Sequence, residues 1–239
     1  MWTLLREREG ITREEAERLV LAGSVRVGDE PVRRVGELVD PQGDVVVDRG
    51  SPYASRGGEK LAFALEALEV DVSGRVALDV GASTGGFSDC LLQHGAELVY
   101  AVDVGFGQLA GKLRADRRVV VYERTNISDP RLTELDPAPS LVTLDLSYLS
   151  LRIAVPVASR TIRGGGEIVA LVKPLFETDD RTARRSGELS AVAARTAADR
   201  LSEALRESGF AASTPIQSPI DGGKGTVEFF VRVSVADAH

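Results

Sequence analysis

The stretch that decides the fold is Val76 to Phe87, VALDVGASTGGF. Its first five residues, VALDV, form an apolar run that is typical of a buried parallel strand. The small residues from Gly81 to Gly86 then predict a tight loop, with a helix starting near Gly85. Glycines permit positive φ and let a ligand approach the backbone, and the first turn of a helix offers unpaired amides. We therefore expect a cofactor to bind here through a carboxylate or a phosphate.

Two common phosphate-binding patterns do not match this loop. A nucleotide-triphosphate loop requires Gly-Lys-Ser/Thr, whereas Gly85-Gly86-Phe87 contains no lysine. A dinucleotide fingerprint would place its middle glycine at position 83, which is serine. Asp79, an acid at the end of the first strand, would repel a pyrophosphate and attract the amino group of a methionine moiety. Asp103 follows the strand expected over 98–102, where a carboxylate can bind both hydroxyls of a ribose.

S-adenosyl-L-methionine and NAD both carry a ribose, so it is Asp79 that favours S-adenosyl-L-methionine over NAD as the cofactor. A strand, loop and helix without any ligand is the alternative that the loop alone leaves open.

Composition sets broad limits on the chain. Its 239 residues are 43% hydrophobic, which suits one sizeable core and a second small domain. We expect a cytoplasmic protein without a membrane partner, because no apolar run reaches the roughly 18 residues of a span and the N-terminus has no signal-peptide core. One cysteine, Cys90, and two histidines, His94 and His239, predict neither a disulfide nor a zinc site. The net charge of −7 does not favour a nucleic acid partner.

Residues 1–48 predict a small α+β domain of two helices and short strands. The first helix ends near Gly10, Thr12 caps the second, and the runs 25–27 and 45–47 alternate beside Gly28-Asp29 and Gly43-Asp44 turns. The segment 49–58 is rich in Gly, Ser and Pro and predicts a linker. We expect the main domain over 59–239.

The main domain alternates strands and helices, which predicts an α/β fold with a doubly wound, Rossmann-like sheet. The expected strands are 76–80, 98–102, 119–121, 141–144, 167–172, 211–216 and 226–233. Helices are expected over 59–68 and 188–208. Ligands of such sheets bind beyond the carboxyl ends of the strands, so Asp79, Asp103 and Asp145 should face one crevice. Lys173 follows a buried strand, so its ammonium must find a carboxylate or become easier to deprotonate, and Asp145 is the evident partner.

Two parts of the chain carry a resemblance. Gly10-Ile-Thr-Arg13, Ala16 and Leu21-Ala-Gly-Ser-Val25-Arg-Val27 resemble a small RNA-binding domain first described in a ribosomal protein. Ser55-Arg-Gly-Gly-Glu-Lys60 and Gly225-Thr-Val-Glu228-Phe-Phe230 resemble motifs of the TlyA/hemolysin A ribosomal RNA methyltransferases, whose catalytic domain is related to the FtsJ group. The resemblance runs through most of the chain. The first helix is shorter than is usual in the family, and 178–187 departs from its glycine-rich stretch.

The resemblance implies a seven-stranded sheet whose last strand is antiparallel, and transfer of a methyl group from S-adenosyl-L-methionine to a ribose 2′-hydroxyl of ribosomal RNA. The implied catalytic tetrad is Lys60, Asp145, Lys173 and Glu228. The cofactor residues that we expect are Asp79, Gly81, Ser83, Gly85, Gly86, Phe87, Asp103 and, at the adenine edge, Asn126. The arginines that we expect to contact RNA are Arg13, Arg26, Arg33 and Arg34. No metal is required.

Three other functions stay open at this point. The chain could be an RNA-binding assembly factor of the same fold without catalysis, a methyltransferase for a small molecule, or a cytolysin, as the family's historical name suggests. The cytolysin is disfavoured because no strongly amphipathic cationic helix is visible. The arginine-bearing segment 178–187 is expected to be either a lid or an exposed loop. The sequence leaves the oligomeric state open.

Overall fold

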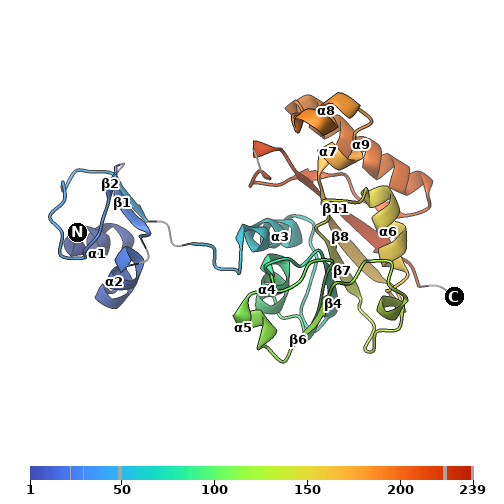
Figure 1. The fold of residues 1–239 in the computed structure, drawn as a ribbon, viewed down its shortest axis with the longest axis horizontal. Coiled ribbons are helices and arrows are strands. Elements are labelled where there is room, and N and C mark those ends of the chain that lie inside the picture. The colour runs from blue at the N-terminus through green and yellow to red at the C-terminus, as the bar shows by residue number, and fades with distance from the viewer. Residues whose placement is uncertain (22, 29, 48–49, 223–224, 238–239) are drawn as a thin grey trace. The chain divides into compact units, whose positions relative to one another are not determined.

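The computed structural model describes residues 1–21, 23–28, 30–47, 50–222 and 225–237, and the chain divides into two compact units, Met1–Pro52 and Tyr53–His239 (Figure 1). Residues outside these ranges include Asp29 of the expected Gly28-Asp29 turn, residues 223 and 224, and His239. No helix among the described residues is long and apolar enough to cross a membrane.

The first unit packs two helices, α1 (Trp2–Glu9) and α2 (Arg13–Leu21), on a small antiparallel sheet. The strand order is β2-β1-β3, with β1 (Val25–Val27) between β2 (Glu30–Pro31) and β3 (Val45–Val47). Helix α1 ends at Gly10, whose positive φ of 65° suits a glycine. Its core consists of Met1, Leu5, Ile11, Ala16, Leu19, Val20, Val25 and Val32. This α+β module has its own hydrophobic core.

The second unit is built on one mostly parallel sheet of eight strands. The main strand order is β10-β11-β8-β7-β4-β5-β6, and β9 pairs with β11. The strands are β4 (Val76–Val80), β5 (Leu98–Asp103), β6 (Val119–Glu123), β7 (Leu141–Leu144), β8 (Gly166–Val172), β9 (Ala211–Ala212), β10 (Ile216–Gln217) and β11 (Phe229–Val235). Strands β4 to β8 pair in parallel, whereas β11 is antiparallel to β8, as the resemblance implied for the last strand. The sheet has eight strands rather than the expected seven, because the segment 211–216 contributes to two short strands.

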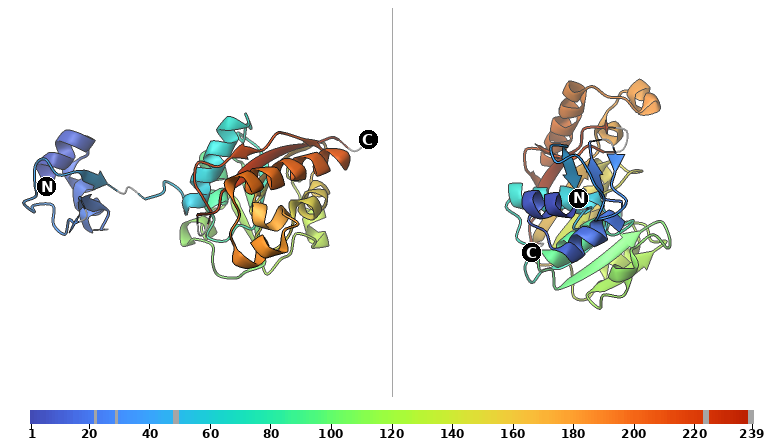
Figure 2. Two further views of the ribbon diagram at one scale, coloured as in Figure 1. Left: turned by 90° about the horizontal axis from the view of Figure 1, so that it is seen from above. Right: turned by 90° about the vertical axis from the view of Figure 1, so that its left-hand side faces the viewer.

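Helices cover both faces of this sheet (Figures 1 and 2). One face packs against α3 (Arg56–Ala67), α4 (Gly86–Gln93) and α5 (Gly111–Arg114). The other face packs against α6 (Leu151–Ser159) and α9 (Ala191–Glu207). The short helices α7 (Pro174–Glu177) and α8 (Arg181–Ser186) lie beside α9, and a 3-10 turn, Pro130–Thr133, follows β6. Alternate residues of each strand serve the two layers: Phe229 and Val231 face α6 and α9, whereas Phe230 faces α3. The doubly wound Rossmann-like fold is confirmed.

Four boundaries differ from the expectation. Helix α3 starts at Arg56, inside the segment predicted to be a linker. The strand expected over 211–216 is two short strands, because Pro215 has no amide for a sheet hydrogen bond. Strand β11 starts at Phe229 rather than at 226, which places Glu228 just before it. The segment 178–187 contains α8, which Asp180 caps and Gly187 ends.

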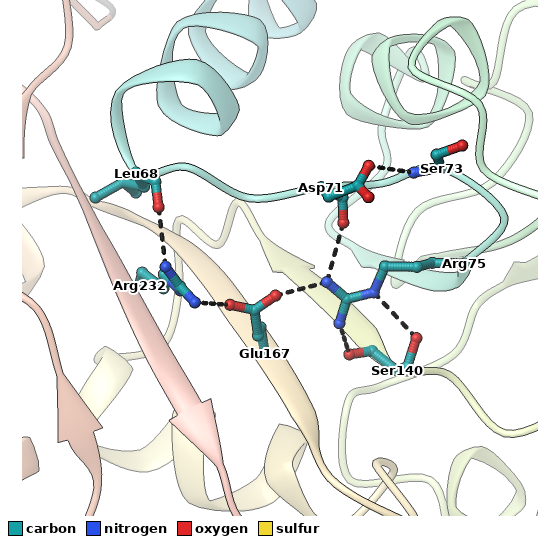
Figure 3. A network of polar contacts seen from close by, with 7 residues as sticks. All are labelled: Leu68, Asp71, Ser73, Arg75, Ser140, Glu167 and Arg232. Atoms are coloured by element: carbon teal, nitrogen blue, oxygen red, sulfur yellow. Dashed lines mark hydrogen bonds and ion pairs between the residues drawn. The ribbon is translucent and has the colours of Figure 1, made fainter.

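An ion-pair network joins three strands at the amino ends of the parallel strands (Figure 3). Glu167 of β8 accepts a 2.6 Å hydrogen bond from Arg75, which precedes β4, and its other oxygen pairs with Arg232 of β11. Arg75 also bonds Ser140, before β7, and Arg232 donates to the Leu68 carbonyl after α3. The network therefore anchors the end of the sheet opposite to the strand tips.

We predict that Glu167→Gln lowers the free energy of unfolding by about 1 to 3 kcal/mol, because it leaves two half-buried guanidinium groups without their shared charge. Urea denaturation followed by circular dichroism measures the loss. The control is Asp199→Asn, which breaks the exposed Arg195–Asp199 pair and should cost less than about 0.5 kcal/mol. Equal losses in the two variants would contradict a role for the network.

Candidate active site

Two ion pairs lie beyond the carboxyl ends of the central strands. The Lys173 Nζ atom is 2.5 Å from Asp145 Oδ1, and the Lys60 Nζ atom is 2.6 Å from Glu228 Oε2. The Lys173 contact is an ion pair whose angles fall outside those of a hydrogen bond. The structure thus joins the four side chains of the predicted tetrad as two pairs.

The sheet accounts for three of these positions. Asp145 directly follows β7, and its backbone amide donates to the Val80 carbonyl at the end of β4. Lys173 directly follows β8. Because β11 pairs with β8 so that Phe229 lies opposite Val172, Glu228 comes next to Lys173 at the same sheet edge. Lys60 comes from the first turns of α3, and its 12% exposed side chain reaches the 6% exposed Glu228 side chain.

Three adjoining cavities meet at these charges. One of about 270 Å³ is lined by Lys60, Gly81 and Asp145. A second of about 320 Å³ is lined by Asp103, Thr125, Asp145 and Lys173. A third of about 290 Å³ contacts Lys173 and Glu228 and has apolar walls that include Phe176, Leu189 and Val227. The first two share Gly81, Ser83 and Asp145, and the second and third share Ser147 and Lys173, so Asp145 and Lys173 stand where the cavities meet.

The loop after β4 uses its glycines for close backbone packing. Gly81 has φ 91°, and a Cβ there would lie 2.2 Å from the Asp145 carbonyl oxygen. Gly85 also has positive φ, and a Cβ on Gly86 would lie 2.3 Å from Ser55 Oγ. Phe87 is buried and packs against Phe230. The loop therefore fits tightly between the Asp145 segment and the start of α3, and its residues from Gly81 to Phe87, except Gly85, line the first cavity.

Asp103 is a wall residue of the second cavity. Its carboxylate accepts from the Ser83 amide at 2.7 Å and from the Gly105 amide at 2.6 Å, so it joins the glycine loop to the segment after β5. A carboxylate has about four lone-pair sites, so two remain for ribose hydroxyls. The residues at this end of the cavity match the hydrogen-bonding groups of an adenosyl cofactor.

Asn126 lies outside the second cavity, whereas its neighbour Thr125 lines it. The exposed Asn126 side chain accepts from the Ser128 amide at 3.0 Å and from Ser128 Oγ at 2.9 Å. Its carbonyl oxygen therefore forms a local turn. Its contact with an adenine edge stays a prediction.

Asp79 requires a correction, because it is enclosed beneath the glycine loop. Its oxygens accept from Ser88 Oγ at 2.6 Å and from Thr143 Oγ1 at 2.9 Å, and the side chain is fully buried. Asp79 still pairs within β4, one residue before the strand ends, and so points at α4 rather than into the crevice. A direct contact between this carboxylate and the amino group of a cofactor does not fit that position. Asp79 instead links β4, α4 and β7.

Glu177 ends the short run Pro174-Leu-Phe-Glu177 after Lys173, and no role was predicted for it from the sequence. It is 6% exposed, and it accepts from Ser150 Oγ at 2.6 Å and from the Leu151 amide at 2.8 Å. Burial raises the pKa of this carboxyl, while the two hydrogen bonds lower it. An acid that ends a short apolar turn was the only signal in the sequence.

The predicted RNA-binding arginines all belong to the first unit and are exposed. Arg13 pairs with Glu17 at 3.1 Å along α2. The backbone amides of Arg33 and Arg34 donate to Glu37, and these bonds hold the pKa of the Glu37 carboxyl below its usual value. Arg26 lies in β1. Among the described residues, no group of three or more His, Cys, Asp or Glu side chains is arranged to hold a metal ion.

A Rossmann-like sheet with a glycine loop after its first strand and an acid at the end of its second is typical of enzymes that bind a nucleoside cofactor, and S-adenosylmethionine-dependent methyltransferases are one such class. Comparison with known proteins agrees. The FtsJ-like methyltransferase model matches residues 53–234, and the S4 domain model matches residues 3–46. The chain belongs to the FtsJ-like methyltransferases and carries an S4 domain before the catalytic domain.

Individual relatives span nearly the whole chain. It is 39% identical to "16S/23S rRNA (cytidine-2'-O)-methyltransferase TlyA" of Mycobacterium tuberculosis, over 92% of this chain and 83% of that protein. It is 35% identical to "Hemolysin A" of Brachyspira hyodysenteriae, over 94% of this chain and 95% of that protein. A solved structure, "Putative hemolysin from Streptococcus thermophilus", aligns with a TM-score of 0.73 at 35% identity, over 99% of this chain and 88% of that one.

Asp79 generates a prediction about pH. Burial raises the pKa of its carboxyl from 3.8 to about 6, so the folded chain holds this proton more tightly than the unfolded chain does. The free energy of unfolding should therefore fall as the pH rises from about 4 to about 6, by up to about 3 kcal/mol, and then level off. Urea denaturation across this range measures the slope. Asp79→Asn should remove the contribution of this carboxyl to the slope, whereas the exposed-site control Asp199→Asn should retain that contribution. An unchanged slope in Asp79→Asn would contradict the assignment.

Proposed function

We propose that this chain transfers a methyl group from S-adenosyl-L-methionine to a ribose 2′-hydroxyl of ribosomal RNA. The observation that carries the proposal is the Lys173–Asp145 pair at the junction of the cavities. On one side of the pair lies the ribose-binding acid Asp103, and on the other lies a cavity with apolar walls next to Lys173. The relative in Mycobacterium tuberculosis, named a 16S/23S rRNA (cytidine-2'-O)-methyltransferase, supports ribosomal RNA as the substrate. This substrate implies action in the cytoplasm.

The cofactor residues follow from the walls of the first two cavities. Asp103 binds the ribose hydroxyls, and Thr125 lies toward the adenine. The backbone from Gly81 to Gly86 faces the methionine part, at the start of α4. Bound there, S-adenosyl-L-methionine supplies the electrophilic methyl group. The acceptor nucleoside enters from the third cavity, where apolar walls suit a base.

The chain's own groups activate the hydroxyl. A ribose hydroxyl is a poor nucleophile, so its proton must be accepted or its loss made easier while the methyl group is held in line. Lys173 does this as the base or as a cation beside the developing oxyanion, and Asp145 holds Lys173 in place at 2.5 Å. The Lys60–Glu228 pair closes the other side of the site and orients the hydroxyl. No metal is needed for this transfer.

The first unit provides the contact with RNA. Its four exposed arginines, Arg13, Arg26, Arg33 and Arg34, are the positive groups that we assign to phosphates, and the S4 match supports an RNA-binding role for this module. A small-molecule substrate is the second candidate, favoured by the net charge of −7. A salt-dependent ribosomal RNA pull-down separates the two, because counterion release weakens only binding to nucleic acid as salt rises.

Lys173→Ala should lower the single-turnover methylation rate by on the order of a hundredfold or more, the scale of a lost acid–base group. Its affinity for S-adenosylhomocysteine, measured by calorimetry, should stay within a few fold. The matched variant Asp103→Ala should instead weaken that affinity by roughly ten- to a hundredfold, because it removes a carboxylate bonded to two hydroxyls. Near-parental methylation by Lys173→Ala would show that the tetrad assignment is wrong.

A chain that begins at Tyr53 should keep cofactor binding and lose activity on ribosomal subunits. The two hydrophobic clusters of the second unit lie wholly within it, so we expect the truncated chain to fold. Calorimetry with S-adenosylhomocysteine and methylation of intact subunits measure the two properties. Full activity of the truncated chain on subunits would exclude the first unit as the RNA contact.

A further inference from the structure

Two loops carry the reactive ion pair, and a single buried carboxylate connects them. Asp145 begins the segment that leads into α6, and Lys173 begins α7. Glu177, four residues after Lys173, accepts from Ser150 Oγ and from the Leu151 amide, five and six residues after Asp145. The α7 turn is itself closed, because the Phe176 amide donates to the Lys173 carbonyl and the Thr178 amide to the Pro174 carbonyl.

We propose that Glu177 is a positioning residue, which holds Lys173 against Asp145 by tying α7 to the start of α6. The inference rests on the proposed function of that pair. Glu177 does not react, since each of its oxygens already accepts a bond from the α6 terminus and its side chain is 94% enclosed. A negative group at the first turn of a nine-residue helix is also favoured by the helix dipole.

A purely structural role would be a helix cap with no effect on the ion pair. The geometry favours an effect on the ion pair, because Lys173 begins and Glu177 ends the same hydrogen-bonded turn. A shift of the Glu177 carboxylate should therefore move the whole turn, including Lys173. The positive groups near the Glu177 carboxyl are Arg152 of α6 and Arg184 of α8. Lys173 itself pairs with Asp145.

Lysine spectroscopy tests the positioning directly. The full chain contains four lysines, Lys60, Lys112, Lys173 and Lys224, so labelling lysine Cε with ¹³C yields four cross-peaks. Lys173→Arg assigns the peak of interest, and Asp145→Asn shows where that peak lies without its partner's charge. In Glu177→Ala the Lys173 peak should move toward the Asp145→Asn position. The Lys60 peak should stay, because Glu228 holds that ammonium independently.

Kinetics provide the second measurement. Glu177→Ala should lower kcat for methylation of ribosomal subunits about tenfold, with the KM for cofactor within about twofold, the scale of one or two buried hydrogen bonds. Glu177→Gln keeps an acceptor oxygen and should recover most of the rate. The control Ser202→Ala removes a part-buried hydrogen bond of 2.5 Å to the Ser213 carbonyl, far along α9, and should leave kcat unchanged.

An unmoved Lys173 peak in Glu177→Ala would overturn the positioning role, whatever the rate. A moved peak with a parental kcat would support the positioning and contradict the proposed catalytic role of the pair. If all four peaks collapsed in Glu177→Ala, Ser150→Ala would replace it, because that variant removes only one of the two bonds. The same peak movement is then expected, and its absence would overturn the proposal.

Discussion

The antiparallel pairing of β11 with β8 is the constraint on which the rest of the second unit depends. Phe229 lies opposite Val172 at one end and Val235 opposite Gly166 at the other. Beyond the first end, this register brings Glu228 next to Lys173; near the other, it brings Arg232 to Glu167. A slip of one residue would exchange the two faces of β11, moving Phe229 into the wrong layer and turning Glu228 away from Lys60.

The two ends of the sheet hold their charges differently. At the amino ends, Glu167 is shared by Arg75 and Arg232, and each arginine also donates to a backbone carbonyl. At the carboxyl ends, each lysine has one carboxylate, and the pairs border open cavities. A single contact leaves donors and lone pairs for a substrate, while burial of the surrounding strands keeps the geometry fixed. For this reason we assign the Glu167 network to the stability of the sheet and the two lysine–carboxylate pairs to catalysis.

Local patterns were enough to predict the strand tips, because an apolar run followed by an acid or a lysine marks the place where a buried strand reaches the crevice. Asp103, Asp145 and Lys173 lie where this reasoning placed them. The same reasoning was wrong about the direction of Asp79, because β4 continues for one more paired residue, Val80, and the Asp79 side chain stays buried within the sheet. The contact of Lys60 with Glu228 joins residues 168 positions apart and follows from the register of β11, which no local pattern contains. The role of Glu177 was not predicted either, because its contacts with Ser150 and Leu151 also join residues far apart in the sequence.

Net charge proved a poor guide to the surface that matters. Three acids that line the cavities have partners, since Asp145 pairs with Lys173, Glu228 pairs with Lys60, and Asp103 accepts from two amides. The exposed Asp221 also lines the first cavity. In the same unit, Arg181, Arg184 and Arg185 of α8 are exposed beside Gly187, which lines the cavity next to Lys173. A phosphate backbone responds to the potential within about 8 Å at physiological salt, not to the sum over the chain. An acidic protein can therefore present a locally positive approach to Lys173, the lysine that we propose for catalysis.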